Sequence, residues 1–190
     1  MQNITKNTPI VILGQGGLGA NLTMLLLEQG YKNLTVVDAD TVDEKFCKRF
    51  TYFTDSKLLN NGRSKVKVVK DIALKRGYKD NLKYHAYMIT PEFNFEKFKD
   101  SFVIISVDIL STRQMIELNL KKNGIPFIHI GCNLNSVSLF KTSLDIMGDD
   151  PMPDAQTSYE VVPDTKTYLV ACLEVLNYLN PTKINIYKEE

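Results

Sequence analysis

The sequence predicts an α/β fold with a mostly parallel sheet and helices on both of its faces. Two observations carry this prediction. Short apolar runs rich in β-branched residues alternate along the chain with longer segments of helical character. The first of these runs leads into a glycine-rich stretch, GQGGLG at residues 14–19, which is typical of a tight turn from a strand into a helix. In such sheets the strands end at a common edge, and ligands bind outside that edge.

The first half of the chain predicts three strands and two helices. PIVIL at residues 9–13 is a β-branched run that ends at a glycine, as buried strands do, and a helix follows over 18–28. LTVV at residues 34–37 is the next strand. Residues 64–76 are amphipathic, because their valine, isoleucine and leucine side chains give one mostly apolar face. Residues 82–87 are expected to form the third strand.

The second half repeats this alternation. We expect strands at FVIIS (102–106), PFIHI (126–130), SVSLFK (136–141) and, at the sheet edge, residues 183–187, with helices over 112–123 and 165–179. FVIIS is apolar throughout, which indicates a strand buried on both faces, whereas SVSLFK alternates and therefore fits a half-exposed strand.

The length and charge of the chain limit its organisation and its partners. A chain of 190 residues suits one domain, so we expect a single domain over 1–190. Residues 142–165, which are rich in proline and acidic residues, are expected to form an exposed crossover loop, and residues 166–190 a C-terminal helix and edge strand. The net charge of +1 gives no reason to expect nucleic acid or a membrane as a partner.

The three cysteines, Cys47, Cys132 and Cys172, are far apart in the sequence and form no Cys-x-x-Cys pair. This pattern argues against a disulfide framework or a structural zinc site and favours a reduced, cytoplasmic setting. His85 and His129 lie in strand-like segments, where we expect them to be packed.

The glycine loop, residues 14–19, is the first candidate binding feature. Its glycines are Gly14, Gly16, Gly17 and Gly19, which make a G-x-G-x-x-G pattern with one extra glycine. Such a loop lets the backbone approach a phosphate at a helix N-terminus. Asp38 ends the second strand, where a carboxylate accepts hydrogen bonds from a ribose. Both features fit NAD and ATP equally well. A glycine loop can also simply pack a helix on a strand, and an aspartate at this place can also be a helix N-cap or a turn residue.

Four charged residues on loops of the same predicted edge favour ATP: Asp40, Arg49, Lys65 and Asp108. Basic side chains offset the charge that develops on phosphates, and an aspartate recruits magnesium. Nucleotidyl transfer needs these groups, whereas hydride transfer does not. A proton donor or substrate domain for an NAD-dependent oxidoreductase is not evident in the sequence.

The set formed by GQGGLG, DADTV, Arg49, Lys65 in GRSK, and Asp108 followed by Thr112 and Arg113 resembles the ubiquitin-activating-enzyme superfamily in its small ThiF/MoeB-type form. The likeness runs from about residue 8 to residue 140. It implies a Rossmann-like fold with antiparallel later strands, and a homodimer. The implied activity is ATP- and Mg²⁺-dependent adenylation of a C-terminal carboxylate, often that of a ubiquitin-like or sulfur-carrier protein.

The resemblance also implies a role for each matching residue. The glycine loop would pass beneath the triphosphate, and Asp38 would bind the ribose with Asp40 nearby. Arg49 and Lys65 would contact the phosphates. Asp108 would bind Mg²⁺ and help to orient the carboxylate, while the helix that opens at residues 112–113 would fix its loop.

The chain departs from this pattern at several places. Phe46, Phe50 and Ile109 stand where the family usually has asparagine, glutamine and asparagine. The zinc-binding Cys-x-x-Cys pairs are absent from the sequence, and residues 142–165 contain no cysteine. No arginine precedes Arg49 to serve a dimer partner, so only Lys6 could substitute.

These departures leave two hypotheses within the family. The first is an adenylyltransferase without its own thioester cysteine, in which Cys47 or Cys132 could approach the ligand but is not expected to bond to it. The alternative is a non-catalytic scaffold or pseudoenzyme subunit of the same fold that binds a ubiquitin-like partner.

Overall fold

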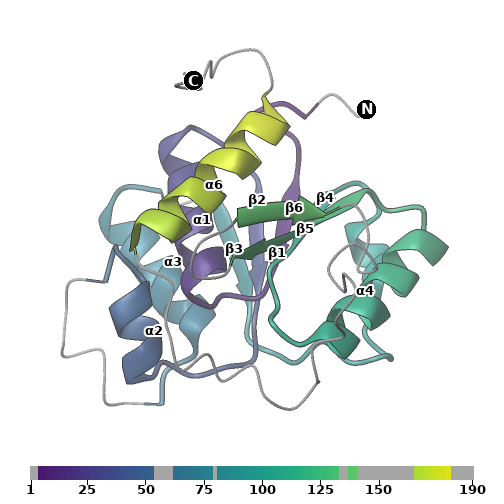
Figure 1. The fold of residues 1–190 in the computed structure, drawn as a ribbon, viewed down its shortest axis with the longest axis horizontal. Helices are drawn as coiled ribbons and strands as arrows, with labels where there is room; N and C mark the ends of the chain where they lie inside the picture. The colour runs from purple at the N-terminus through teal and green to yellow at the C-terminus, as the bar shows by residue number, and fades with distance from the viewer. Residues whose placement is uncertain (1–3, 54–61, 79–80, 133–136, 141–164, 181–190) are drawn as a thin grey trace.

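The structure is a computed structural model. It describes residues 4–53, 62–78, 81–132, 137–140 and 165–180 (Figure 1). The edge strand expected over 183–187 and the crossover loop, apart from Thr165, lie outside these residues. Within the described part of the chain, no helix has the length and apolar character that crossing a bilayer requires.

In the described part of the chain, six strands form one sheet in the order β3-β2-β1-β4-β5-β6. The strands are β1 (Ile10–Leu13), β2 (Leu34–Val37), β3 (Leu82–His85), β4 (Phe102–Ile105), β5 (Phe127–Cys132) and β6 (Val137–Phe140). All neighbours pair in parallel except β6, which runs antiparallel to β5. The predicted fold class, including the antiparallel later strand, is therefore confirmed.

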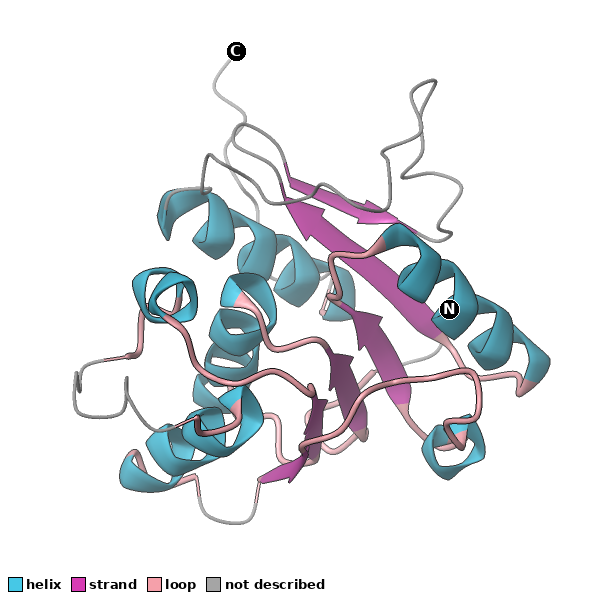
Figure 2. Cartoon of the chain, turned by 90° about the horizontal axis from the view of Figure 1, so that it is seen from below, coloured by secondary structure: helices cyan, strands magenta, loops and turns pink. Residues whose placement is uncertain are grey.

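Helices cover both faces of this sheet (Figures 1 and 2). The helices are α1 (Gly17–Glu28), α2 (Glu44–Arg49), α3 (Lys65–Lys75), α4 (Leu110–Lys122) and α6 (Thr165–Leu179), with a 3₁₀ turn, η2 (Phe95–Phe98). Successive strand residues point to opposite faces. Ile10 and Ile12 of β1 thus join a core with α1, α3 and α6, whereas Val11 and Leu13 join a second core with α4 and η2.

Two short elements, α2 and η2, were not predicted. Each begins with a side-chain cap, since Asp43 Oδ1 accepts a hydrogen bond from Phe46 N at 2.6 Å and Asn94 Oδ1 accepts one from Glu96 N at 3.0 Å. Both are shorter than two helical turns, so their apolar residues show no periodicity that a sequence pattern could reveal. Strand β3 also ends at His85, two residues before the predicted end.

A buried polar network joins α4 to β5. His129 Nε2 lies 3.0 Å from Glu117 Oε2, and the Lys121 ammonium lies 2.5 Å from Glu117 Oε1. Arg113 Nη2 donates to Ile130 O at 3.0 Å. His129 is fully buried, as expected for a packed histidine. Burial, and next the Arg113 charge, lower the pKa of His129 to about 4, so its ring is neutral at pH 7.

We expect this histidine to make stability depend on pH. Its folded-state pKa lies below the ordinary 6.5, so the unfolded chain takes up the proton first. The free energy of unfolding should therefore fall as the pH drops from 6.5 towards 4, by on the order of 2–3 kcal/mol from this group. Urea titrations of the wild type and of His129→Gln over this range would measure the contribution. Equal pH slopes in the two proteins would contradict it.

Candidate functional site

The glycine loop makes a very tight turn between β1 and α1. Gly14 has a φ of +95°, and a Cβ built on it would lie 2.8 Å from the backbone of Ser106, at the end of β4. A Cβ on Gly19 would lie 2.0 Å from the Gly14 carbonyl oxygen, far inside contact distance. At Gly19 the first turn of α1 therefore packs directly on the end of β1, and at Gly14 the end of β1 packs on the backbone that follows β4. Only glycine permits these two close approaches.

Among the described residues, the N-terminus of α1 has open space at Gly16, although Gly17 is packed. A Cβ on Gly16, the N-cap residue, would meet no atom within 4 Å. The helix has no side-chain cap and no acidic residue in its first turn, so its N–H groups and the positive end of its dipole are available to an anion. Helix N-termini of this kind commonly bind phosphate groups; we call the open space at Gly16 the cradle.

Asp38 ties the carboxyl end of β2 to the glycine loop. Its Oδ2 accepts a hydrogen bond from Gln15 N at 2.5 Å, and its Oδ1 accepts one from Asp40 N at 2.7 Å. Burial raises the pKa of Asp38, while these two hydrogen bonds lower it in part. Each carboxylate oxygen can accept a further hydrogen bond, so the side chain retains the capacity to bind hydroxyl groups of a ribose.

Asp40 and Lys65 come together beside Asp38. Lys65 Nζ lies 2.7 Å from Asp40 Oδ2, and Lys65 N donates to Asp40 O at 2.9 Å. An isolated antiparallel β-bridge between Thr41 and Ser64 continues this backbone pairing. The Lys65 side chain is 12% exposed, and its ammonium lies 5.9 Å from the centre of the Phe46 ring. The beginning of α3 is thus held to the segment that follows β2.

Arg49, the last residue of α2, lies against the first turn of α1. A Cβ on Gly17 would be 2.6 Å from Arg49 Cβ. Arg49 Nε is buried and has no hydrogen-bond partner among the described residues. Its neighbours Phe46 and Phe50 are buried, with ring centroids 5.3 Å apart, so the two aromatic departures from the family pattern belong to the core.

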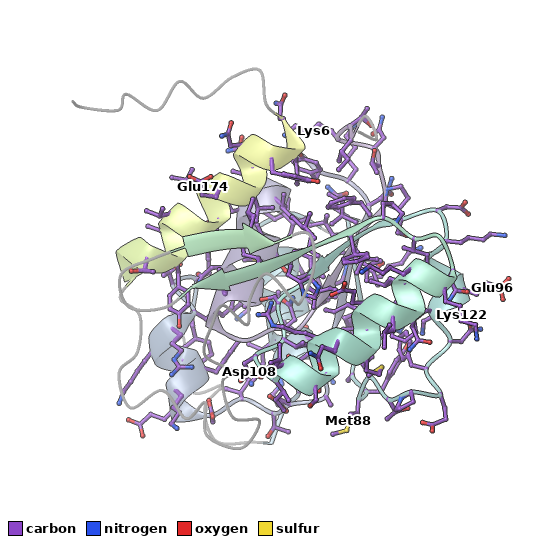
Figure 3. The ribbon with its side chains drawn as sticks, turned by 45° about the vertical axis from the view of Figure 1, so that its right-hand side comes forward. Lys6, Met88, Glu96, Asp108, Lys122 and Glu174 are labelled. Atoms are coloured by element: carbon purple, nitrogen blue, oxygen red, sulfur yellow. The ribbon has the colours of Figure 1, made fainter. Side chains whose placement is uncertain are left out.

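Asp108 lies at the same edge of the sheet, two residues after the contact between Ser106 and Gly14. It is exposed and sits just before α4 (Figure 3). The described part of the chain contains no group of three or more His, Cys, Asp or Glu side chains that could hold a metal. Mg²⁺ in phosphate sites uses one or two carboxylates with waters and phosphate oxygens, and a single exposed aspartate fits that mode.

The structure thus brings the glycine loop, Asp38, Asp40, Arg49 and Lys65 into one connected group. It places Asp108 on the adjoining strand end, and the described contacts do not include one between Asp108 and that group. Ile109, the third departure, is exposed at the start of α4.

The sequence model of the ThiF family matches residues 1–172. The chain belongs to the ThiF family. The resemblance inferred from the motifs is therefore confirmed.

Curated relatives and solved structures agree with the ThiF family assignment. The chain is 29% identical over 124 residues to the SUMO-activating enzyme subunit 2 of Dictyostelium discoideum, which covers 64% of this chain and 18% of the relative. It is 26% identical over 128 residues to the probable adenylyltransferase/sulfurtransferase MoeZ of Mycobacterium tuberculosis, covering 67% of this chain and 32% of the relative. The matched region is thus a third or less of either relative.

A crystal structure of Escherichia coli MccB with ATP superposes with a TM-score of 0.61 at 15% identity. The superposition covers 95% of this chain and 59% of MccB. At this identity the likeness speaks for the fold alone.

Three residues at this ThiF-family site were missed by the sequence reasoning. Asn21 of α1 bonds to the Arg49 segment, and Gln15 is buried beneath the loop, where Thr23 Oγ1 donates to its Oε1 at 3.1 Å. Tyr168 of α6 is buried, and its hydroxyl oxygen would be 3.2 Å from a Cβ on Gly17. Asn21 and Thr23 are polar residues in an otherwise apolar helix, a signal that could have been used. Tyr168 carries no such signal.

The described thiols are poorly suited to covalent catalysis. Cys47 is in α2, and burial, followed by the Asp43 charge, raises the pKa of its thiol. Cys172 is fully buried in α6. A raised pKa keeps a thiol protonated, and the thiolate is the nucleophile. Cys132 ends β5, and its side chain lies outside the described part.

Lys6 is held far from the glycine loop. Its ammonium lies 4.0 Å from the centre of the Tyr31 ring, and its carbonyl oxygen accepts a hydrogen bond from Lys32 N, before β2 begins. Figure 3 shows Lys6 and Asp108 at opposite ends of the molecule. Within one chain, Lys6 therefore does not reach the site.

Two glycine substitutions should separate the two functions of the loop. We expect Gly19→Ala to destabilise the free protein strongly, because its Cβ would overlap the Gly14 carbonyl. Gly16→Ala should leave the unfolding temperature of the free protein nearly unchanged, because its Cβ meets nothing, yet weaken ATP binding by filling the cradle. Thermal unfolding with and without ATP and Mg²⁺ would measure both effects. A Gly16→Ala protein that is stabilised by ATP as much as the wild type would contradict the assignment.

Proposed function

We propose that this chain is an ATP- and Mg²⁺-dependent adenylyltransferase that activates a carboxylate. The convergence at the α1 N-terminus carries the proposal: Asp38 is bonded to the glycine loop, Lys65 is paired with Asp40 beside it, and Arg49 packs on Gly17. A relative named as a probable adenylyltransferase and a structural neighbour crystallised with ATP also support it.

In the proposed reaction each part of the site has a distinct task. Asp38 orients the ribose by accepting hydrogen bonds from its hydroxyl groups, and the N–H groups of the glycine loop hold phosphate oxygens. The substrate carboxylate attacks the α-phosphorus, the bond from that phosphorus to the bridging oxygen breaks, and pyrophosphate leaves with the electron pair. Arg49 and Lys65 stabilise the charge on the departing group. Asp108 would hold Mg²⁺, which offsets phosphate charge when bound.

We propose the C-terminus of a ubiquitin-like or sulfur-carrier protein as the carboxylate substrate. The described thiols, Cys47 and Cys172, are respectively held protonated and buried, so the acyl-adenylate passes to an external nucleophile rather than to either of them. We further propose a reducing, cytoplasmic setting, because the sequence contains no Cys-x-x-Cys pair, and a homodimer, because the family resemblance implies one.

The test of the reaction is ATP–pyrophosphate exchange. With a sulfur-carrier protein ending in Gly-Gly as carboxylate donor, we expect Arg49→Ala and Asp108→Ala each to lower the exchange rate by roughly 10²–10³, the typical cost of losing one group that stabilises developing charge. Circular dichroism should show that both variants remain folded.

Arg76→Ala and Asp100→Ala are matched controls, because these residues are charged but lie outside the site. Their exchange rates should stay close to that of the wild type. Near-normal exchange in both Arg49→Ala and Asp108→Ala would reject the catalytic assignment.

A second candidate function is a non-catalytic scaffold that binds a ubiquitin-like protein. The observation that favours it is that Phe46 and Phe50 are buried, because apolar side chains there replace the polar groups that the family usually places beside Arg49. In this case the fold would persist without nucleotide chemistry.

Ligand-induced stabilisation distinguishes the two candidates. If the chain binds ATP, an ATP concentration of 100 times the dissociation constant should stabilise it by about 2.7 kcal/mol, which is measured as a higher unfolding temperature. NADH at the same concentration should give no shift. The absence of any shift at millimolar ATP with Mg²⁺ would favour the scaffold, and a shift with NADH alone would favour an oxidoreductase.

A further inference from the structure

Asn21 is a buried polar residue on the side of α1 that faces the end of α2. It is 1% exposed, and it lies one turn after Gly17, in a helix whose other buried residues are mostly apolar. A buried amide is costly unless its donors and acceptors are all paired, so its partners indicate what it does.

All four hydrogen-bonding positions of the Asn21 amide are occupied. Its Nδ2 donates to Gly17 O at 2.7 Å and to Arg49 O at 2.7 Å. Its Oδ1 accepts from Thr51 N at 3.0 Å and from Thr51 Oγ1 at 2.6 Å. One side chain therefore joins the first turn of α1 to the backbone on both sides of Phe50.

This connection matters because α2 is a six-residue helix. Helices this short are not stable by themselves, so outside contacts must fix where α2 ends. Phe46 and Phe50 anchor α2 to the core, but apolar contacts have little directional preference. The hydrogen bond from Asn21 to Arg49 O is directional, and it acts on the residue whose Cβ packs against Gly17.

We propose that Asn21 is a positioning residue that places Arg49 at the nucleotide phosphates. The inference rests on the proposed function, since it assigns Arg49 to ATP. Asn21 itself is buried beneath the Arg49 segment and acts through that arginine. Its removal should leave the guanidinium present but displaced from the cradle at the α1 N-terminus.

The test is a double-mutant cycle on ATP affinity, measured by isothermal titration calorimetry of the full chain with ATP and Mg²⁺. We expect Asn21→Ala to weaken ATP binding roughly tenfold, a change typical of one lost or misplaced ionic hydrogen bond. Arg49→Ala should weaken it by at least as much. If Asn21 acts through Arg49, the double variant should bind ATP no more weakly than Arg49→Ala alone.

Asn119→Ala is the matched control. Asn119 also donates a side-chain hydrogen bond to the carbonyl oxygen four residues earlier, that of Met115 at 2.9 Å, but it lies in α4 and has no described bond to the Arg49 segment. Its ATP affinity should match that of the wild type. If Asn21→Ala does not fold, Thr51→Val removes only the hydroxyl bond to Asn21, and it should weaken ATP binding about two- to threefold, again without further effect in the Arg49→Ala background.

The outcomes separate this inference from the function on which it rests. The positioning role would be overturned if the losses of ATP affinity from Asn21→Ala and Arg49→Ala were additive in the double variant. It would also be overturned if Asn21→Ala and Thr51→Val both bound ATP as tightly as the wild type. Either result would leave the nucleotide site intact. A wild type that does not bind ATP, or an Arg49→Ala variant that binds as tightly as the wild type, would overturn the proposed site and the positioning role together.

Discussion

The contact between the first turn of α1 and the end of β1 is the constraint on which the site depends. With Gly19 packed onto the Gly14 carbonyl, α1 starts immediately above the sheet, and Gln15 N is directed to the Asp38 carboxylate. The helix N-terminus then faces the same edge at which β2 and β4 end. A side chain at Gly19 would push α1 away from the end of β1 and move the groups that are tied to it, including Arg49, whereas one at Gly14 would overlap the backbone of Ser106.

The parts of the site that the sequence predicted are those set by local spacing. The glycine loop and Asp38 are fixed by the ends of two neighbouring strands, so their register follows once β1 and β2 are recognised. Asn21 and Tyr168 were missed because their roles depend on where α2 and α6 pack. Asn21 is bonded to Arg49, which is 28 positions away in the sequence, and Tyr168 packs near Gly17, which is more than 150 positions away. Sequence patterns of one helix do not contain that information.

The phenylalanines at positions 46 and 50 give α2 more apolar contacts and fewer polar groups than the family pattern implies. Their burial adds apolar contacts that hold α2 against the core, and the Lys65 ammonium lies near the Phe46 ring. A partly exposed ion pair such as Lys65–Asp40 contributes little stability by itself. Apolar packing and the amide of Asn21 therefore hold α2 in place, so this structural task does not depend on the charge of Arg49.

Arg49 Nε is buried and has no hydrogen-bond partner in the part of the chain that the structure describes. A buried donor without a partner costs about 1–3 kcal/mol, and a folded chain retains few of them without a reason. Packing alone does not require a guanidinium here, because the contact with Gly17 involves only Arg49 Cβ. Under the proposed function, ATP at the N-terminus of α1 would bring acceptors close to the end of α2, and contact with the buried Nε itself would require the Arg49 side chain to move.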